Sequence, residues 1–534
     1  MLPPNSHVFA LALDSTGSAT ISDMLAYQAR IRAHDPFVVF EDAAGQAHEM
    51  TYATMDQQAS RMANLLRRLG VGKGATIHVH LPNCVEFYIC WFGAVRAGAV
   101  IVPTNPLATA DELRYIIEHA ECRLSVTQPD LLSTVSQAAQ PLAGRHQIVV
   151  ARTDSAPGDR VLIFSRELAR EAPKHTAETG NASDVAGILY TSGTTSLPKG
   201  VLITNASYIH AGEAVAQHLR LRPDDRMLIA LPLFHGNAQY YSTMPALVTG
   251  ASIALMERFS ASRWARQAAD YWATVASLFA APIRMLLAQP LRPDDSHNAL
   301  RVTMFAQNIT EEQLTQFEQR FGCPLIQLYG MTETVAPATL NPLYGERRNM
   351  SMGRPLLPTQ VRIVDGEGSD VPEGTVGQLL VRGHMGRTIM AGYLKNTAAT
   401  AETVRDGWLY TGDNVRADAD GYIYFVDRGK DMIKRAGENI ATSEIERVIN
   451  MHPAVFESAA IGIPDALRDE AIKVFVVLHP GAHADEADIT EWCRTRLAKF
   501  KIPSAVEFVE SLPRTSVGKI QKHILRAQEQ EHHG

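Results

Sequence analysis

Twelve consecutive residues, Tyr190 to Val201, read YTSGTTSLPKGV, and almost none of them is suited to a hydrophobic core. The stretch follows a short apolar run, GILY, and precedes a helical pattern that begins near Thr204 or Asn205, both good N-caps. A strand, a polar glycine loop and a helix form an anion-binding layout, because free backbone N–H groups and hydroxyls can surround phosphate oxygens. The loop is not a Walker A motif, since its lysine follows a proline and no serine or threonine comes next.

The groups that this loop offers to phosphate are backbone amides at two glycines, four hydroxyls and one ammonium. They belong to Thr191, Ser192, Gly193, Thr194, Thr195, Lys199 and Gly200. A surface turn would have a similar composition, so the loop alone does not identify a nucleotide site.

Five further segments contain residues able to do chemistry: LPLFHG (231–236), QLYGMTET (327–334), GWLYTGD (407–413), VDRGKDMIKRAGENI (426–440) and LPRTSVGKI (512–520). Together with the loop, and in this order, they resemble the motifs of the adenylate-forming superfamily, which contains acyl-CoA synthetases, luciferases and the adenylation domains of peptide synthetases. Several motifs in one order are far more specific than any single motif. TSGTTSLPKGV, MFAQN and FVDRGKDMIKRAGEN resemble most the crotonobetaine/carnitine–CoA ligase branch.

This resemblance implies an ATP-dependent carboxylic acid–CoA ligase. A carboxylate attacks the α-phosphorus of ATP, pyrophosphate leaves, and the acyl-adenylate then acylates the thiol of coenzyme A with release of AMP. Such a site must stabilise spreading negative charge and align two anions that repel each other. ATP, Mg²⁺ and coenzyme A are the expected cofactors, and a small-molecule carboxylic acid is the expected partner.

The resemblance also gives roles to the residues of QLYGMTET. Tyr329 would lie against the adenine ring, and Gly330 belongs to the same nucleotide-binding set. Thr332 would contact the α-phosphate, and Glu333 would be the magnesium ligand. A single carboxylate suits Mg²⁺, which keeps much of its water.

Four other residues receive roles in the same way. Lys199 and its loop would bind the β- and γ-phosphates. Asp413 would accept hydrogen bonds from the ribose hydroxyls and Arg428 would donate to the ribose. His235 resembles the gate beside the acyl pocket.

The last group of residues serves the two half-reactions. Lys519 would be the catalytic lysine of adenylation, because its ammonium can bridge the substrate carboxylate and an α-phosphate oxygen. The resemblance places a hinge at Lys430, about which a C-terminal domain swings. Gly437 would then let the pantetheine arm pass close to the backbone, with help from Lys434.

The acid pocket is expected to be lined from HGNAQYYS, FAAPIR and MFAQN. Phe305-Ala306-Gln307-Asn308 stands where many members of the superfamily have GGAP, and the bulk of Phe305 is expected to shorten the pocket. Tyr240, Tyr241 and Phe305 could form a cation–π cage for a quaternary ammonium group. A carnitine-like acid, a small or medium polar acid and an aryl acid all stay open.

The elements that position these residues follow from hydrophobic periodicity. From about residue 50 to 345, short β-branched runs alternate with helical patterns, which predicts βαβ units and mostly parallel sheets. We expect an α/β fold with a large N-terminal AMP-binding domain (1–427), whose β-rich subdomain covers about 346–427. A hinge (428–430) and a smaller, mobile α+β C-terminal domain (431–534) follow.

Composition excludes several other classes of protein. The 534 residues are 46% hydrophobic, and the net charge of -7 arises from mixed signs along the chain, which argues against nucleic-acid binding. Five cysteines without a CxxC pair indicate neither a disulfide framework nor a zinc site, and favour a reducing, cytoplasmic setting. Neither a signal peptide nor a membrane span is recognised.

Three functions other than a CoA ligase stay open. A stand-alone adenylation enzyme would load a carrier protein instead of CoA, a luciferase-like oxygenase would consume oxygen, and a non-catalytic nucleotide-binding protein would do neither. A lysine acetyltransferase acting on Lys519 is a candidate partner, because acetylation removes the charge. The oligomeric state is open, with a homodimer as one option.

Overall fold

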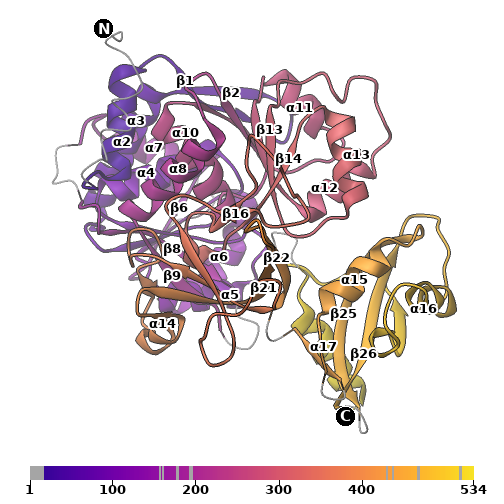
Figure 1. Ribbon diagram of the computed structural model, residues 1–534. Coiled ribbons are helices and arrows are strands. Elements are labelled where there is room, and N and C mark those ends of the chain that lie inside the picture. The colour runs from indigo at the N-terminus through magenta and orange to yellow at the C-terminus, as the bar shows by residue number, and fades with distance from the viewer. Residues whose placement is uncertain are drawn as a thin grey trace.

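A computed structural model gives the fold of the chain. It describes residues 17–142, 144–155, 158, 161–175, 180–191, 197–428, 431–435, 438–465, 469–515 and 520–533. A large N-terminal body carries a smaller C-terminal body at one side, and the chain passes between them after strand β22 (Ile423–Arg428) (Figure 1). This confirms the predicted α/β fold with a large and a small part.

The first sheet has, within the described residues, nine strands in the order β16-β15-β14-β13-β12-β10-β11-β1-β2. The six strands from β14 to β1 run parallel, and the outer three pair antiparallel. The strands are β1 (Pro36–Glu41), β2 (Ala47–Thr51), β10 (Arg226–Ile229), β11 (Ser252–Met256), β12 (Val275–Phe279), β13 (Val302–Ala306), β14 (Leu325–Tyr329), β15 (Thr339–Leu340) and β16 (Arg354–Pro355). The carboxyl ends of β10, β12, β13 and β14 therefore meet at one edge, where α/β sheets usually bind ligands.

The second sheet has eight described strands in the order β19-β9-β8-β4-β3-β5-β6-β7. They are β3 (Thr76–Val79), β4 (Val100–Pro103), β5 (Leu124–Thr127), β6 (Gln147–Val150), β7 (Val161–Ile163), β8 (Val185–Thr191), β9 (Lys199–Thr204) and β19 (Gly392–Tyr393). Strand β9 pairs antiparallel with both β8 and β19.

This pairing corrects the layout expected around the glycine loop. The loop joins the two strands of an antiparallel hairpin, β8 and β9, and does not lead directly into a helix. The helix α8 (Asn205–Leu219) begins where predicted, with the Thr204 hydroxyl accepting a hydrogen bond from the Ser207 backbone N–H at 3.0 Å. The segment KGVLIT between loop and helix is a strand because it is rich in β-branched and apolar residues.

Helices cover both sheets of the large body. They are α2 (Ile21–Ile31), α3 (Tyr52–Arg68), α4 (Val85–Arg96), α5 (Ala110–His119), α6 (Leu132–Ala139), α7 (Phe164–Ala169), α8, α9 (Gly236–Ala238), α10 (Met244–Thr249), α11 (Trp264–Asp270), α12 (Ala280–Leu287), α13 (Glu311–Phe321) and α14 (Thr397–Thr403). Short 3₁₀ turns are η1 (Pro129–Leu131), η2 (Gln140–Leu142) and η4 (Thr332–Thr334), and η3 (Gln239–Thr243) is a π-helix.

A small antiparallel sheet follows the first two in the chain. Its described strands are β17 (Gln360–Val364), β18 (Gly377–Arg382), β20 (Val404–Arg405), β21 (Trp408–Ala417) and β22. Glycine and aspartate turns separate them, as the sequence indicates.

In the C-terminal body, helices pack on a separate sheet. Its elements are β23 (Ile433–Arg435), β24 (Glu438–Ile440), α15 (Thr442–Asn450), β25 (Val455–Asp465), β26 (Asp469–Leu478), α16 (Glu486–Arg494), η5 (Lys499–Lys501), β27 (Ala505–Phe508) and α17 (Lys522–His533). Helices α15 and α16 lie in the segments SEIERVINM and DITEWCRTRLA, and strands β25 and β26 contain ESAAIGI and IKVFVVL.

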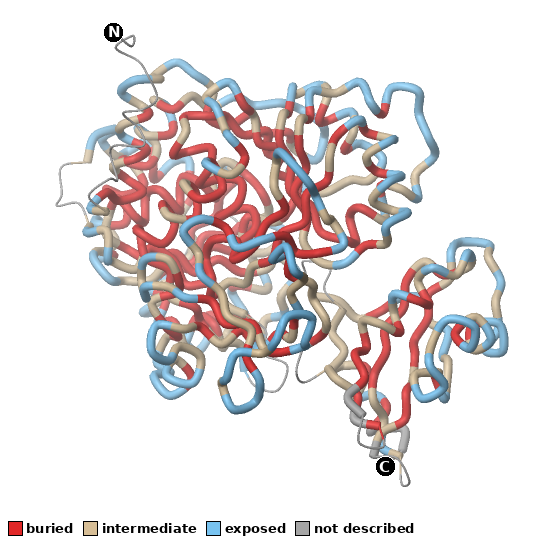
Figure 2. The backbone as a smooth tube through the Cα atoms, viewed as in Figure 1, coloured by how far each residue is buried: buried red, intermediate tan, exposed pale blue. Residues whose placement is uncertain are grey.

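The core of the large body lies between its sheets and helices, whereas the C-terminal body has a core of its own (Figure 2). Strands such as β11 and β12 are buried along their whole length, which explains their nearly continuous apolar sequences. No helix in the described part of the chain is long and apolar enough to cross a bilayer.

Candidate active site

The glycine hairpin places two predicted phosphate-binding residues opposite each other. Thr191 is the last residue of β8 and pairs with Lys199, the first residue of β9. The Lys199 Nζ atom lies 4.9 Å from the centroid of the Tyr393 ring, a cation–π distance. Ser192, Gly193, Thr194 and Thr195 lie outside the described residues.

The turn η4 carries Thr332 and Glu333 and begins three residues after the end of β14 at Tyr329. Glu333 is only 6% exposed, and its Oε1 accepts a hydrogen bond from the Tyr393 hydroxyl at 2.8 Å. Its backbone carbonyl accepts from the Met390 N–H at 2.9 Å. A buried carboxylate is thus held both through its side chain and through its backbone.

Tyr393 connects the hairpin to this turn and was not singled out from the sequence. It lies in β19, which pairs with β9 next to Lys199, and its hydroxyl reaches Glu333, sixty positions earlier in the chain. Burial, and then the charge of Glu333, raise the pKa of Tyr393, so the phenol stays protonated and keeps donating. Nothing in the segment IMAGYLKN distinguishes this tyrosine from a core tyrosine.

Tyr329 and Asp413 form a second contact at the predicted nucleotide site. The Tyr329 hydroxyl donates to Asp413 Oδ2 at 2.6 Å, although the two residues lie 84 positions apart. Asp413 is 3% exposed, and its backbone pairs with that of Arg428 across strands β21 and β22. The side chain of Arg428 lies outside the described part of the structure. The structure therefore brings Tyr329, Asp413 and the backbone of Arg428 together.

Gly330 follows Tyr329 where a side chain would not fit. A Cβ atom at this position would lie 2.3 Å from the Tyr241 Oη atom. Tyr241 belongs to the π-helix η3, a local distortion that is frequent at functional sites. The segment after His235 therefore packs directly against the nucleotide motif.

Contacts with Asn237 and Phe279 hold the His235 ring in place. It caps helix α9, where its Nδ1 accepts from the Asn237 N–H at 3.1 Å, and its ring meets Phe279 edge-on at 5.6 Å. Phe279 packs with Leu231 and Ala306, residues at or beyond the ends of β12, β10 and β13. The three segments expected to line the acid pocket thus meet at the carboxyl edge of the first sheet.

The cation–π cage predicted from Tyr240, Tyr241 and Phe305 is not formed. Phe305 is fully buried on the face of the sheet that packs against α13, whereas both tyrosines belong to the main core on the other side. Neighbouring residues of a strand point to opposite faces, so Ala306, and not Phe305, faces the pocket side. The expectation that Phe305 shortens the pocket is therefore wrong.

The predicted residues of the C-terminal part are only partly described. Lys430, Gly437 and Lys519 lie outside the described residues, and Lys434 belongs to β23 without a described side chain.

Asp427 and Arg284 are among the residues that connect this part to the large body. Asp427 Oδ2 accepts from both the backbone N–H and the hydroxyl of Thr442, at 2.6 and 2.7 Å. Arg284 Nη1 lies 4.0 Å from Glu457 Oε2, while Arg284 Nη2 donates to the carbonyl of Asn308 at 3.0 Å. The orientation of the C-terminal part is thus linked to the AQN segment beside the pocket.

The residues present fit a magnesium ion that is shared with phosphate. Among the described residues, no cluster of three or more His, Cys, Asp or Glu side chains could hold a metal by itself. Glu333 offers a single buried carboxylate, and a Mg²⁺ ion commonly takes one or two protein carboxylates, with phosphates and water completing its coordination.

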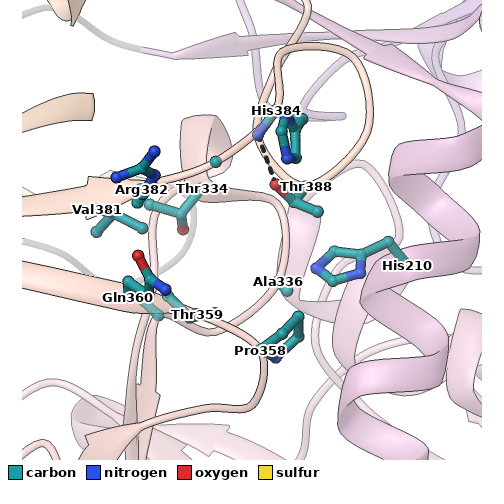
Figure 3. A pocket seen from close by; sticks show the side chains of 12 residues that line it. His210, Thr334, Ala336, Pro358, Thr359, Gln360, Val381, Arg382, His384 and Thr388 are labelled. Atoms are coloured by element: carbon teal, nitrogen blue, oxygen red, sulfur yellow. Dashed lines mark hydrogen bonds between the residues drawn. The ribbon is translucent and has the colours of Figure 1, made fainter. Parts of the chain in front are cut away.

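A separate cavity of about 190 Å³ lies beside the turn η4 (Figure 3). His210, Thr334 and Thr388 contribute side chains to it, and the His384 N–H donates to the Thr388 hydroxyl at 2.8 Å. Tyr329, Glu333 and Asp413 do not line it. The cavity is therefore a neighbour of the nucleotide residues and not their site.

Comparison with known proteins identifies the families that this chain matches. The model of the AMP-binding enzyme family matches residues 25–394, and that of the AMP-binding enzyme C-terminal domain matches residues 444–519. The chain is 37% identical to the crotonobetaine/carnitine–CoA ligase of Proteus mirabilis (strain HI4320) over 495 residues, which cover 91% of this chain and 95% of that one.

Two solved structures have the same fold over nearly the full length. An anthranilate–CoA ligase in complex with anthranoyl-AMP superposes with a TM-score of 0.89 at 27% identity, covering 98% of this chain and 99% of that one. A benzoate–CoA ligase from Burkholderia xenovorans LB400 gives a TM-score of 0.85 at 27% identity, covering 95% and 100%. The resemblance inferred from the motifs is confirmed.

Proposed function

Because the chain belongs to the AMP-binding enzyme family, among the acyl-CoA synthetases of the adenylate-forming superfamily, we propose that it joins a carboxylic acid to coenzyme A. ATP converts the acid to an acyl-adenylate with release of pyrophosphate, and the thiol of CoA then displaces AMP. The observation that carries this proposal is the convergence of Lys199, Tyr393 and Glu333 beside the glycine hairpin. This convergence supports the proposal, because a nucleotide triphosphate needs a cation for its phosphates and a carboxylate for its magnesium ion.

The geometry supports the following roles. Lys199 neutralises phosphate charge, and Thr191 with the rest of the loop surrounds the phosphates. Tyr329, whose phenol is fixed by Asp413, presents its ring to adenine. Asp413 accepts hydrogen bonds from the ribose hydroxyls.

Three further roles rest on the motifs. Thr332 contacts the α-phosphate, Arg428 donates to the ribose, and His235 borders the acyl pocket. Glu333 holds Mg²⁺, which would neutralise charge on the phosphate oxygens when it is bound.

Lys519 and Gly437 divide the two half-reactions in this proposal. Lys519→Ala is expected to abolish adenylation but to leave thioester formation from supplied acyl-adenylate, and Gly437→Leu is expected to do the reverse. Rapid-quench assays of each half-reaction measure this division. Equal loss of both steps in both variants would contradict it.

The acid is proposed to be carnitine-like, small or medium and polar, or aromatic. The relative named above acts on crotonobetaine and carnitine by its name, and the two structural relatives are named for anthranilate and benzoate. These names also favour CoA over a carrier protein as the acceptor.

The deciding experiment is pyrophosphate release across a panel of acids with ATP and Mg²⁺, with and without CoA. Carnitine, crotonobetaine, short aliphatic acids and benzoates belong in the panel. One acid that releases pyrophosphate and yields an acyl-CoA by mass supports the proposal. ATP–pyrophosphate exchange without thioester would point to a carrier protein, and no exchange with any acid would refute the ligase.

A reducing, cytoplasmic setting is proposed as well, because the five cysteines, all within the described ranges, are buried free thiols. A homodimer and acetylation of Lys519 remain proposals that native mass and intact mass would test.

A further inference from the structure

Tyr393 contacts two charged side chains of the proposed ATP site, Glu333 and Lys199. Its hydroxyl donates to Glu333 Oε1 at 2.8 Å, and its ring face lies 4.9 Å from Lys199 Nζ. Tyr393 is 8% exposed and Glu333 6%, so the hydrogen bond between them is shielded from water and stronger than at the surface. Lys199 is half-buried.

The backbone around Tyr393 holds this side chain in place. The Leu394 N–H donates to the Gly200 carbonyl and the Ala391 N–H donates to the Leu202 carbonyl, both at 2.8 Å. The Tyr393 N–H itself donates to the Thr400 hydroxyl at 2.9 Å. The segment 390–394 is thereby attached to the strand that begins with Lys199.

The other end of the same segment is attached to the turn that carries Glu333. The Met390 N–H donates to the Glu333 carbonyl at 2.9 Å. A five-residue segment therefore bonds to the lysine-bearing strand and to the glutamate-bearing turn, and Tyr393 repeats that link with its side chain.

We propose that Tyr393 is a positioning residue that orients the Glu333 carboxylate toward Mg²⁺ and the Lys199 ammonium toward the phosphates of ATP. This inference rests on the proposed function. Opposite charges attract, so a lysine and a glutamate that flank one ring would otherwise be drawn into a direct ion pair. Such a pair would remove both groups from the nucleotide. The hydroxyl fixes one charge, and the ring face holds the other.

Two substitutions separate the two contacts. Tyr393→Phe keeps the ring over Lys199 and removes only the hydrogen bond to Glu333. Tyr393→Leu removes both contacts. Tyr271→Phe is a matched control, because the Tyr271 hydroxyl donates to the carboxylate of Glu41 at 2.9 Å in a different part of the large body.

The experiment measures ATP binding to the full-length protein by isothermal titration calorimetry, with Mg²⁺ and with EDTA. Tyr393→Phe is expected to leave ATP affinity in EDTA within about twofold and to reduce it about tenfold with Mg²⁺, as for the loss of a hydrogen bond to a charged group. Tyr393→Leu is expected to weaken binding in both conditions. Tyr271→Phe is expected to change neither.

A double-mutant cycle tests whether Tyr393 acts through Glu333. In a Glu333→Gln background, Tyr393→Phe is expected to cause no further loss of Mg²⁺-dependent affinity. Additive losses, or equal losses with Mg²⁺ and EDTA, would overturn the proposal. If the unmodified protein binds ATP and responds to Mg²⁺ but Tyr393→Phe behaves like it, only this inference fails; if the unmodified protein binds no ATP, the proposed function fails with it.

Discussion

At the scale of single residues, the contact between Tyr329 and Asp413 makes a direct prediction. Tyr329→Phe keeps the ring but removes the hydrogen bond that orients it and that partly satisfies a buried carboxylate. ATP binding is expected to weaken by about 1–2 kcal/mol, roughly tenfold, because a hydrogen bond to a charged group is lost. The measurement is the KM for ATP at saturating acid.

A control for this variant lies directly before strand β22 of the small antiparallel sheet. The Tyr422 hydroxyl donates to the Glu346 backbone carbonyl, and Tyr422→Phe is expected to leave the KM for ATP unchanged. An unaltered KM in Tyr329→Phe would mean that the Tyr329 ring keeps its position without the hydrogen bond to Asp413.

At the scale of elements, the packing of the π-helix against β14 depends on Gly330. Gly330→Ala would place a Cβ 2.3 Å from Tyr241 Oη, so the tyrosine or the nucleotide motif must move. Overpacking of this kind costs about 1–3 kcal/mol. We expect a lower Tm and weaker ATP binding.

The double variant Gly330→Ala/Tyr241→Phe removes the clashing oxygen and is expected to recover most of the loss. Gly72→Ala serves as a control, because its added Cβ would meet nothing within 4 Å. No recovery in the double variant would show that the glycine is needed for another reason.

Two buried histidines, His78 and His80, lie in and directly after strand β3 of the second sheet. His78 bonds to Ser125 and Thr104, and His80 bonds to the same Thr104, each at 2.8 Å. Burial lowers the pKa of His80 to about 4 and that of His78 below its usual range. The folded protein therefore holds both rings neutral.

In the unfolded protein, histidines bind protons near pH 6.5, whereas the folded protein keeps these two rings neutral to lower pH. The free energy of unfolding is therefore unaffected by the two histidines above pH 6.5 and falls as the pH drops toward 4. For His80 alone the loss is about 2 kcal/mol at pH 5. Chemical denaturation between pH 7 and 4 should show a shallower decline for His80→Asn than for the unmodified protein. His48→Asn, at an exposed histidine, should follow the unmodified curve.

The elements show what the sequence could predict and what it could not. Strands and helices with strong periodicity, such as β12, α5 and α15, lie in segments whose sequences already favour them, because that signal is local. Strand β9 was missed because KGVLIT is short and lies between a polar loop and a well-capped helix. The face of Phe305 depends on its register with β12, which no local pattern contains.

The residues of the candidate site likewise include some that the sequence predicts and some that it does not. Residues inside long motifs, such as Glu333 and Asp413, could be chosen from the sequence because several motifs recur in one order. Tyr393 could not, because its importance lies in contacts with residues sixty and more positions away.

At the scale of the whole molecule, Arg284 is expected to influence how the two bodies sit against each other. Its guanidinium reaches both the Asn308 carbonyl and Glu457 of β25, whereas Glu457 keeps Arg514 as a second partner within the C-terminal part. Arg284→Gln should therefore loosen the orientation without unfolding either body. A partly buried pair of this kind contributes about 1 kcal/mol, so the population should shift about fivefold.

Fluorescence energy transfer between dyes on the two bodies would measure this shift. Arg348→Gln is the control, because its partners Asp418 and Asp420 lie on the same body as Arg348. Identical transfer efficiencies for Arg284→Gln and the unmodified protein would exclude a role for Arg284 in orientation.

The two hydrogen bonds from Thr442 to Asp427 have a consequence for rotation between the bodies. The residue before helix α15, Ala441, has no side chain to cap it, so Asp427 of β22 satisfies the first backbone amide of that helix from outside. A rotation about the proposed hinge (428–430) that separates Asp427 from Thr442 would expose this amide to solvent, at a cost of about 1 kcal/mol. With each such rotation the first turn of α15 would fray, and its amide protons would exchange with solvent while Asp427 and Thr442 are apart.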